Sequence, residues 1–144
     1  MAFRGTFDYS LDAKKRLTVP ARFRATLSDG VVLAKQVDPC VALWRPDDYE
    51  AYTQSILQGL HPFSNEAQQL ERFFAANAVD TELDSAGRVG IPAFLLEYGG
   101  LDKEVVVTGA GRCLEIWDRA AWADHDARLK DSVADIRASL GNAG

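Results

Sequence analysis

The sequence predicts an α+β protein in which one small β-rich unit occurs twice and helices follow the strands of each copy. Two observations lead to this prediction: an internal repeat at an offset of 72 residues (position 83 against position 11), and short alternating segments separated by turn residues. The 144 residues, of which 47% are hydrophobic and 26% charged, supply enough apolar side chains for a folded core.

The repeat is clearest around an Asp-X-X-X-Arg motif. Residues 11–21 (LDAKKRLTVPA) align with residues 83–93 (LDSAGRVGIPA), and leucine, aspartate, arginine, proline and alanine are identical at matched positions. The match continues with CVALW at 40–44 against CLEIW at 113–117, which requires one inserted residue. A duplication explains a match of this length, and it divides the chain into a first copy, residues 1–77, and a second copy, residues 78–144.

The sequence patterns predict the same order of elements in each copy: an alternating strand, a turn, a short returning strand, a short helix that begins at a proline, two more strands, and a helical end. The expected strands are residues 5–9, 17–20, 31–35 and 41–44 in the first copy, and 78–83, 89–92, 104–108 and 113–117 in the second. The expected helices are residues 21–27 and 46–58, one that begins at residue 64, 93–98, and 118–140.

The last of these helices is expected to bury an apolar stripe that consists of Trp122, Leu129, Val133 and Ile136. The other aromatic residues at repeat-equivalent positions, such as Trp44 and Trp117, are expected to pack in the core. Stacking on nucleic-acid bases is the less favoured alternative for them.

The charge distribution favours a nucleic-acid partner for one part of the chain, although the net charge is −5. Residues 1–24 hold six basic against two acidic residues, a balance of +4, and the remainder holds 10 basic and 19 acidic residues, a balance of −9. Local charge matters most because electrostatic attraction is screened over about 8 Å. A basic surface without any partner is the alternative that charge alone leaves open. The candidate DNA-binding residues are Arg4, Lys14, Lys15, Arg16, Arg22 and Arg24.

The two Asp-X-X-X-Arg motifs have different predicted roles. In the second motif, Asp84 and Arg88 enclose only small residues, so a structural turn with a carboxylate cap is expected. In the first motif, cations on a turn between two short strands suit a β-ribbon in the DNA major groove. Asp12 is expected to organise this turn, because its charge would repel phosphate.

Other classes of function find little support in the sequence. His61 and His125 lie outside any acid–base or nucleophile pattern, and no phosphate-binding glycine loop occurs, so we expect no enzyme, cofactor or small-molecule substrate. Cys40 and Cys113 are expected to be buried thiols, and the chain offers no paired spacing for a structural zinc ion. No apolar run suits a membrane span or a signal peptide, and the expected location is the cytoplasm.

Three motifs together resemble the MraZ family of bacterial regulators: FRGT at residues 3–6, LDxxxRLxVP at 11–20, and LDxxxRVxIP at 83–92. The resemblance covers roughly residues 1–140. It implies two AbrB/MazE-like units that form a double-split, swapped-hairpin β-barrel with packed helices. It also implies ring homo-oligomers, associated with the nucleoid, that bind direct DNA repeats upstream of their own operon in the division and cell-wall gene cluster. Lys14 is expected to be a departure from the family, at a loop position where glycine is common.

The sequence therefore predicts a sequence-specific, DNA-binding transcriptional regulator whose partners are double-stranded DNA and further copies of itself. A protein-interaction scaffold or antitoxin-like module, which would bind a partner through the acidic second half, is the alternative.

Overall fold

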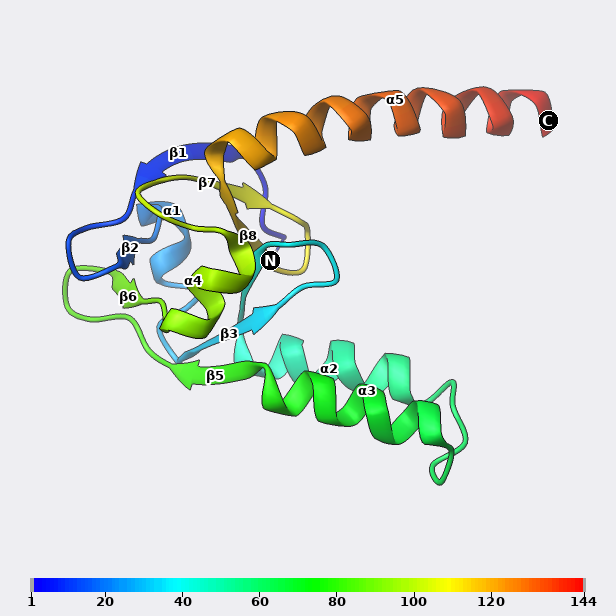
Figure 1. Cartoon of the computed structure of the whole chain (residues 1–144), viewed down its shortest axis with the longest axis horizontal. Helices are drawn as coiled ribbons and strands as arrows, with labels where there is room; N and C mark the ends of the chain where they lie inside the picture. Colours follow the sequence, from blue (N-terminus) through cyan, green and yellow to red (C-terminus); the bar gives the residue numbers. More distant parts are fainter. Residues whose placement is uncertain (1, 144) are drawn as a thin grey trace.

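The computed structural model describes residues 2–143 and shows an α+β fold (Figure 1). In each copy, two strands precede a short helix, and two further strands precede the helical end, as the sequence predicts. The elements are β1 (Thr6–Ser10), β2 (Arg16–Thr18), α1 (Ala21–Arg24), β3 (Val31–Lys35), β4 (Val41–Trp44), α2 (Pro46–Leu57), α3 (Asn65–Ala76), β5 (Ala78–Thr81), β6 (Arg88–Gly90), α4 (Ala93–Gly99), β7 (Glu104–Gly109), β8 (Leu114–Asp118) and α5 (Arg119–Ala143).

The main sheet interleaves strands of the two copies. Its six antiparallel strands have the order β1-β7-β8-β4-β3-β5, and β4 and β8 join the copies at its centre. The first strand of each copy pairs with a strand of the other copy: β1 with β7, and β5 with β3. The copies therefore exchange their first strands and share one sheet.

A second, two-stranded sheet, β2–β6, lies apart from the main sheet, and a common core fills the space between them. Leu17 and Val89, at the centres of β2 and β6, have exposed fractions of 0% and 1%, and they join Phe23 of α1 and Leu95 of α4 in this core. The strands of residues 2–143 form two separate sheets, so the closure of a barrel stays a prediction.

Helices α2 and α5 cover the other face of the main sheet. Trp44 lies in a second apolar cluster, where it stacks on Tyr52 of α2 with ring centroids 4.8 Å apart. Trp117 packs against Trp122 of α5 in a tilted arrangement, with ring centroids 5.6 Å apart. Both tryptophans are 2% exposed, which confirms that they pack in the interior.

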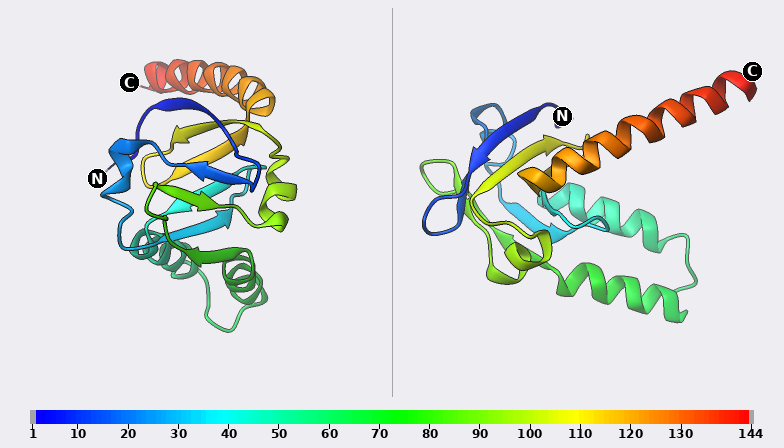
Figure 2. Two further views of the ribbon diagram at one scale, coloured as in Figure 1. Left: turned by 90° about the vertical axis from the view of Figure 1, so that its left-hand side faces the viewer. Right: turned by 45° about the horizontal axis from the view of Figure 1, so that its top comes forward.

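The buried stripe predicted for the last helix is wrong beyond its first turns. Trp122 is partly buried, but Leu129, Val133 and Ile136 are 44%, 43% and 57% exposed. Figures 1 and 2 show the reason: α5 leaves the sheet after its first turns and projects away from the body. Its apolar face therefore has nothing to pack against within one chain.

Helices α2 and α3 form a second projecting arm (Figures 1 and 2). No residue of α2 is fully buried, and in α3 only Ala67 is. The arm is held together at its base, where the Tyr49 hydroxyl donates a hydrogen bond of 2.9 Å to the carbonyl oxygen of Phe74.

Some element boundaries differ from the prediction. Helix α1 ends at Arg24 rather than at residue 27, because the amide of Leu27 is shared between the carbonyl oxygens of Phe23 and Arg24 as the helix tightens into a turn. Strand β5 ends at Thr81 rather than at residue 83, because its partner β3 begins at Val31 and offers no residue beyond that pair.

Candidate nucleic-acid interface

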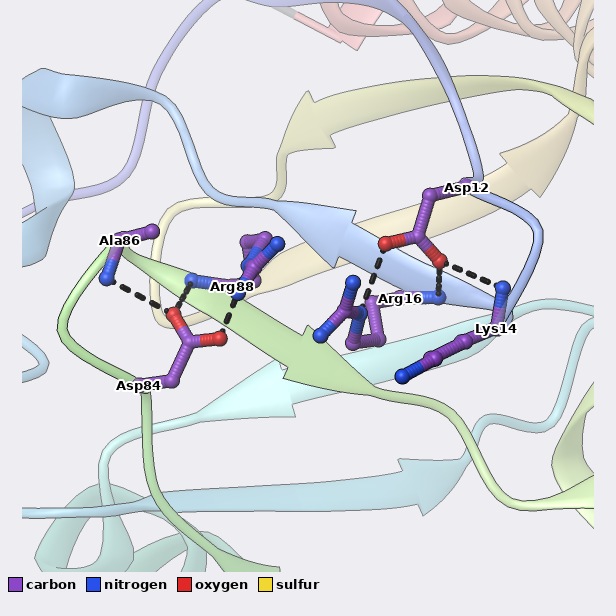
Figure 3. Close-up of polar contacts among 6 residues, drawn as sticks. All are labelled: Asp12, Lys14, Arg16, Asp84, Ala86 and Arg88. Carbon is purple, nitrogen blue, oxygen red and sulfur yellow. Dashed lines mark hydrogen bonds and ion pairs between the residues drawn. The ribbon is translucent and has the colours of Figure 1, made fainter.

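Both Asp-X-X-X-Arg motifs form the same hydrogen-bonded loop. In the first, Asp12 Oδ1 accepts the backbone amides of Lys14 and Arg16, each at 2.9 Å, and Asp12 Oδ2 accepts Arg16 Nε at 2.7 Å (Figure 3). In the second, Asp84 Oδ1 accepts the amides of Ala86 and Arg88 at 2.9 Å, and Oδ2 accepts Arg88 Nε at 2.8 Å. The two loops thus have almost the same local geometry.

These contacts keep both carboxylates ionised. The backbone amide of Arg16 lowers the pKa of Asp12, and the guanidinium of Arg16 acts in the same direction. The amide and guanidinium of Arg88 lower the pKa of Asp84 in the same way. Each loop therefore holds a paired negative and positive charge at neutral pH, and Arg16 Nε is occupied by Asp12.

The ribbon β2–β6 joins the two loops into one surface (Figure 3). Its register pairs Leu17 with Val89 and Thr18 with Arg88, in antiparallel orientation. Leu17 and Val89 face the core, so the residues on either side of each are directed to the opposite, partly exposed face. Arg16 and Arg88, which are 72 positions apart in the sequence (88 against 16), consequently lie on the same two-stranded ribbon.

The first loop differs from the second at its third variable position. Lys15 adopts a positive φ of 58°, and its structural equivalent is Gly87, with a φ of 75°. The glycine of the second loop therefore corresponds to Lys15 and not to Lys14, and Lys15 occupies the position where the backbone favours glycine. Lys15 Nζ donates to the carbonyl oxygen of Asp102 at 3.1 Å and forms an ion pair with its carboxylate at 3.2 Å.

Arg24 belongs to the end of the ribbon that carries the second loop. Its Nε donates to the carbonyl oxygen of Val19 at 3.0 Å, and its side chain lies directly against Gly87. A cation of the first copy thus lies beside the Asp84–Arg88 pair and adds positive charge to the second loop. The sequence alone does not reveal this contact, because it depends on how the copies pair.

The remaining two candidates occupy the N-terminal side of the fold. The guanidinium of Arg22 lies over the ring of Phe7, 5.3 Å from its centroid. Arg4 is exposed, and its backbone lies against Gly109 at the end of β7. The structure therefore distributes the six predicted residues over three regions: Lys14, Lys15 and Arg16 in the first loop, Arg24 at the second, and Arg4 and Arg22 beside β1.

Acidic neighbours reduce the positive charge of this surface without cancelling it. Around the two loops, five cations (Lys14, Lys15, Arg16, Arg24, Arg88) face three carboxylates (Asp12, Asp84, Asp102). Solvent reaches these ion pairs, since the side chains of Arg16 and Arg88 are 29% and 36% exposed, and ion pairs in contact with solvent contribute little to stability. Phosphate groups can therefore compete for these cations at low energetic cost.

Other chemistry-bearing residues do not assemble into a site within residues 2–143. No group of three or more histidine, cysteine or acidic side chains there is placed to hold a metal ion. Cys40 and Cys113 are free and buried, as predicted, and burial raises the pKa of Cys113 to about 12. The His125 ring lies against Trp117 in a tilted arrangement, with centroids 4.4 Å apart, so it is part of the packing of α5.

The described part of the chain also contains no helix that combines the length and the apolar character needed to cross a lipid bilayer.

Comparison with known proteins defines the class to which this duplicated fold belongs. The family model described as "MraZ protein, putative antitoxin-like" matches the chain twice, over residues 2–73 and 74–140. The two matches cover most of both copies, and the chain belongs to the MraZ family.

Individual relatives extend over the same length. A protein named "Transcriptional regulator MraZ" from Desulfitobacterium hafniense (strain Y51) is 38% identical over 143 residues, 99% of both chains. Proteins with the same name from Lachnoclostridium phytofermentans and Syntrophomonas wolfei are each 34% identical, over 96% and 99% of this chain and 97% and 99% of their own. The similarity therefore includes both motifs and all the helices.

Proposed function

We propose that this protein is a sequence-specific, DNA-binding transcriptional regulator without enzymatic activity. The observation that carries the proposal is the ribbon β2–β6, which carries cations on both of its end loops. The names of the relatives, which describe regulators of transcription, support the same function.

The first loop is the proposed reader of DNA. A two-stranded ribbon fits the width of the major groove, and its side chains then reach base edges. The guanidinium of Arg16 uses Nε for Asp12, and its terminal nitrogens are suited to guanine O6 and N7. Lys14 and Lys15 are point charges that suit phosphate oxygens. Arg24 adds positive charge at the other end of the ribbon.

We further propose that the protein works as a ring of identical copies in the nucleoid of the cytoplasm. One copy has few basic groups, so it would bind DNA weakly and lose affinity steeply with salt. Several copies that engage successive direct repeats would gain affinity through linkage alone. The family resemblance suggests repeats upstream of the protein's own operon, in the division and cell-wall gene cluster, and it suggests that the two sheets act together as a swapped-hairpin barrel.

The test compares two matched variants, Arg16→Ala and Arg88→Ala. Each substitution removes one Nε–carboxylate contact of nearly equal length, 2.7 and 2.8 Å, so the structural losses are similar. We expect Arg16→Ala to weaken binding to the upstream duplex by about 1–3 kcal/mol, and Arg88→Ala to leave it near the wild-type value. Fluorescence anisotropy, with a scrambled duplex as competitor, measures both.

Three results decide between the alternatives. A preference of the wild type for the native duplex by at least about a hundredfold supports specific recognition. Equal losses in both variants would mean that the second copy also contacts DNA and that the reader is not confined to the first. Equal, weak binding of the wild type to both duplexes would contradict the regulator. It would favour the scaffold or antitoxin-like module, which the family description also mentions.

A further inference from the structure

The outer part of α5 carries an apolar stripe that nothing in the chain covers. Leu129, Val133, Ile136 and Leu140 are all exposed, with Leu140 at 69%. Their spacing of four, three and four residues places them on one face of the helix, as in the a and d positions of a heptad. A continuous apolar face of this kind on a projecting helix indicates a protein contact.

The charges beside this stripe are unequal around the helix. Lys130 and Arg137 both follow a stripe residue directly and flank the same side of it. Lys130 pairs with Asp126 on its own helix at 3.1 Å, but its side chain is 76% exposed. Asp131 and Asp135 lie on the opposite side of the helix. The stripe therefore has a basic edge.

A groove with complementary properties runs between α2 and α3. Two adjoining hollows share Leu57 and Glu71, and their apolar lining includes Leu60 and Phe74. The charged residues that line them are all acidic: Glu50, Glu71 and Asp80. Helices α2 and α3 have 12 residues each, about 18 Å at 1.5 Å per residue, and the stripe from Leu129 to Leu140 spans the same length.

The groove and the stripe of one chain do not meet. Helix α5 packs on β7 and β8, whereas α2 packs on β3, and the two arms leave the body separately in both views (Figures 1 and 2). We infer that α5 of one copy docks in the α2–α3 groove of a second copy. The apolar stripe would then cover Leu57 and Phe74, and Lys130 and Arg137 would face the acidic lining.

Pairing of α5 with α5 fits the charges less well. In an antiparallel pair, residues on the basic edge would face one another, and Lys130 would meet Arg137 of the partner helix. In a parallel pair, Lys130 would face His125 and Arg137 would face Ser132 of the partner helix, so neither cation would meet a carboxylate. The acidic groove therefore provides the better complement.

This contact has a consequence for assembly. The stripe and the groove are different surfaces, so each copy that donates α5 still offers its own groove to another. Such head-to-tail contacts close into rings when the rotation between copies allows it. The inference rests on the ring proposed above and names the joint between its subunits.

The first experiment is sedimentation equilibrium of the full chain with Ile136→Asp. We expect the mass to fall from that of the assembly toward that of one chain, 15.8 kDa. Ala138→Asp introduces the same side chain on the opposite face of α5 and should keep the wild-type mass. An unchanged mass for Ile136→Asp would overturn this contact but leave the ring intact, whereas a monomeric wild type would overturn the ring itself.

The second experiment identifies the occupant of the groove. Leu57→Cys and Ile136→Cys are purified separately, mixed, and treated with a short bifunctional thiol reagent. We expect cross-linked dimers in the mixture and none in either variant alone. Cross-linking of Ile136→Cys by itself would mean that α5 pairs with α5, and no product in the mixture would equally contradict the docking. The native thiols add no background, because Cys40 and Cys113 are buried.

Discussion

Asp12 and Asp84 each close a loop with two backbone amides and one guanidinium, so the native loop binds their ionised forms. The amides of Arg16 and Arg88 lower both pKa values from the ordinary 3.8. Because a lowered native pKa means that the unfolded chain binds protons more readily, the resulting stabilisation is complete above pH 3.8. It is lost as the pH falls through the native values.

We therefore expect the free energy of unfolding of the wild type to fall, as the pH is lowered from 3.8 through the native pKa values, by more than that of Asp12→Asn/Asp84→Asn. Urea titrations at several pH values measure both. Parallel pH profiles of the two proteins would show that the native loops do not hold the carboxylates in their ionised form.

Gly87 lies in a backbone conformation that side chains adopt at a cost, and Arg24 is directly above it. A Cβ at this position would stand 2.4 Å from Arg24 Nε, at a φ of +75°. We expect Gly87→Ala to lower the free energy of unfolding by about 1–2 kcal/mol, because of the left-handed backbone, and to displace Arg24 as well.

Lys15→Gly is the matched control, since Lys15 has the same conformation at φ 58° in the first loop. Relief of backbone strain and the greater flexibility of glycine in the unfolded chain oppose one another there. The change in stability should therefore be smaller than for Gly87→Ala. Denaturant titration of both variants tests the pair, and equal destabilisation would contradict the assignment of strain.

At the scale of elements, the α2–α3 arm has little buried surface and depends on contacts at its base. The Tyr49 hydroxyl, whose pKa burial raises to about 12, donates to the carbonyl oxygen of Phe74. We expect Tyr49→Phe to lower the stability of the arm by about 1 kcal/mol. Hydrogen exchange of the α2 and α3 amides should accelerate, while exchange in the core strands β4 and β8 stays unchanged. Equal acceleration in both regions would mean that the arm unfolds only with the whole protein.

At the scale of the whole molecule, a chain with net charge −5 is proposed to bind a polyanion. Its cations must therefore act locally, and affinity should decline steeply with salt. We expect Lys14→Ala to weaken binding to specific and scrambled duplexes about equally and to reduce the slope of log affinity against log salt by about one per loop engaged. Anisotropy across a salt series measures this slope. A change in sequence preference would count against a contact with phosphate alone.

The sequence by itself determined the duplication, the α+β class, the order of the elements and the loops that carry the charged residues. These features depend on local chemistry: turn residues at fixed offsets, prolines that open helices, and alternation within strands. For the same reason Cys40, Cys113 and the repeat-equivalent tryptophans could be predicted to be buried.

Only the tertiary structure decided which of these residues lie together. The pairing of β2 with β6 places Arg16 and Arg88 on one ribbon, and the contact of Arg24 with Gly87 joins the copies; neither leaves a local signal, because strand partners are chosen by the packing of the whole core. For α5, the sequence does identify the apolar face. Its periodicity indicates that Leu129, Val133 and Ile136 share a side, but whether that side is covered depends on where the helix leaves the sheet.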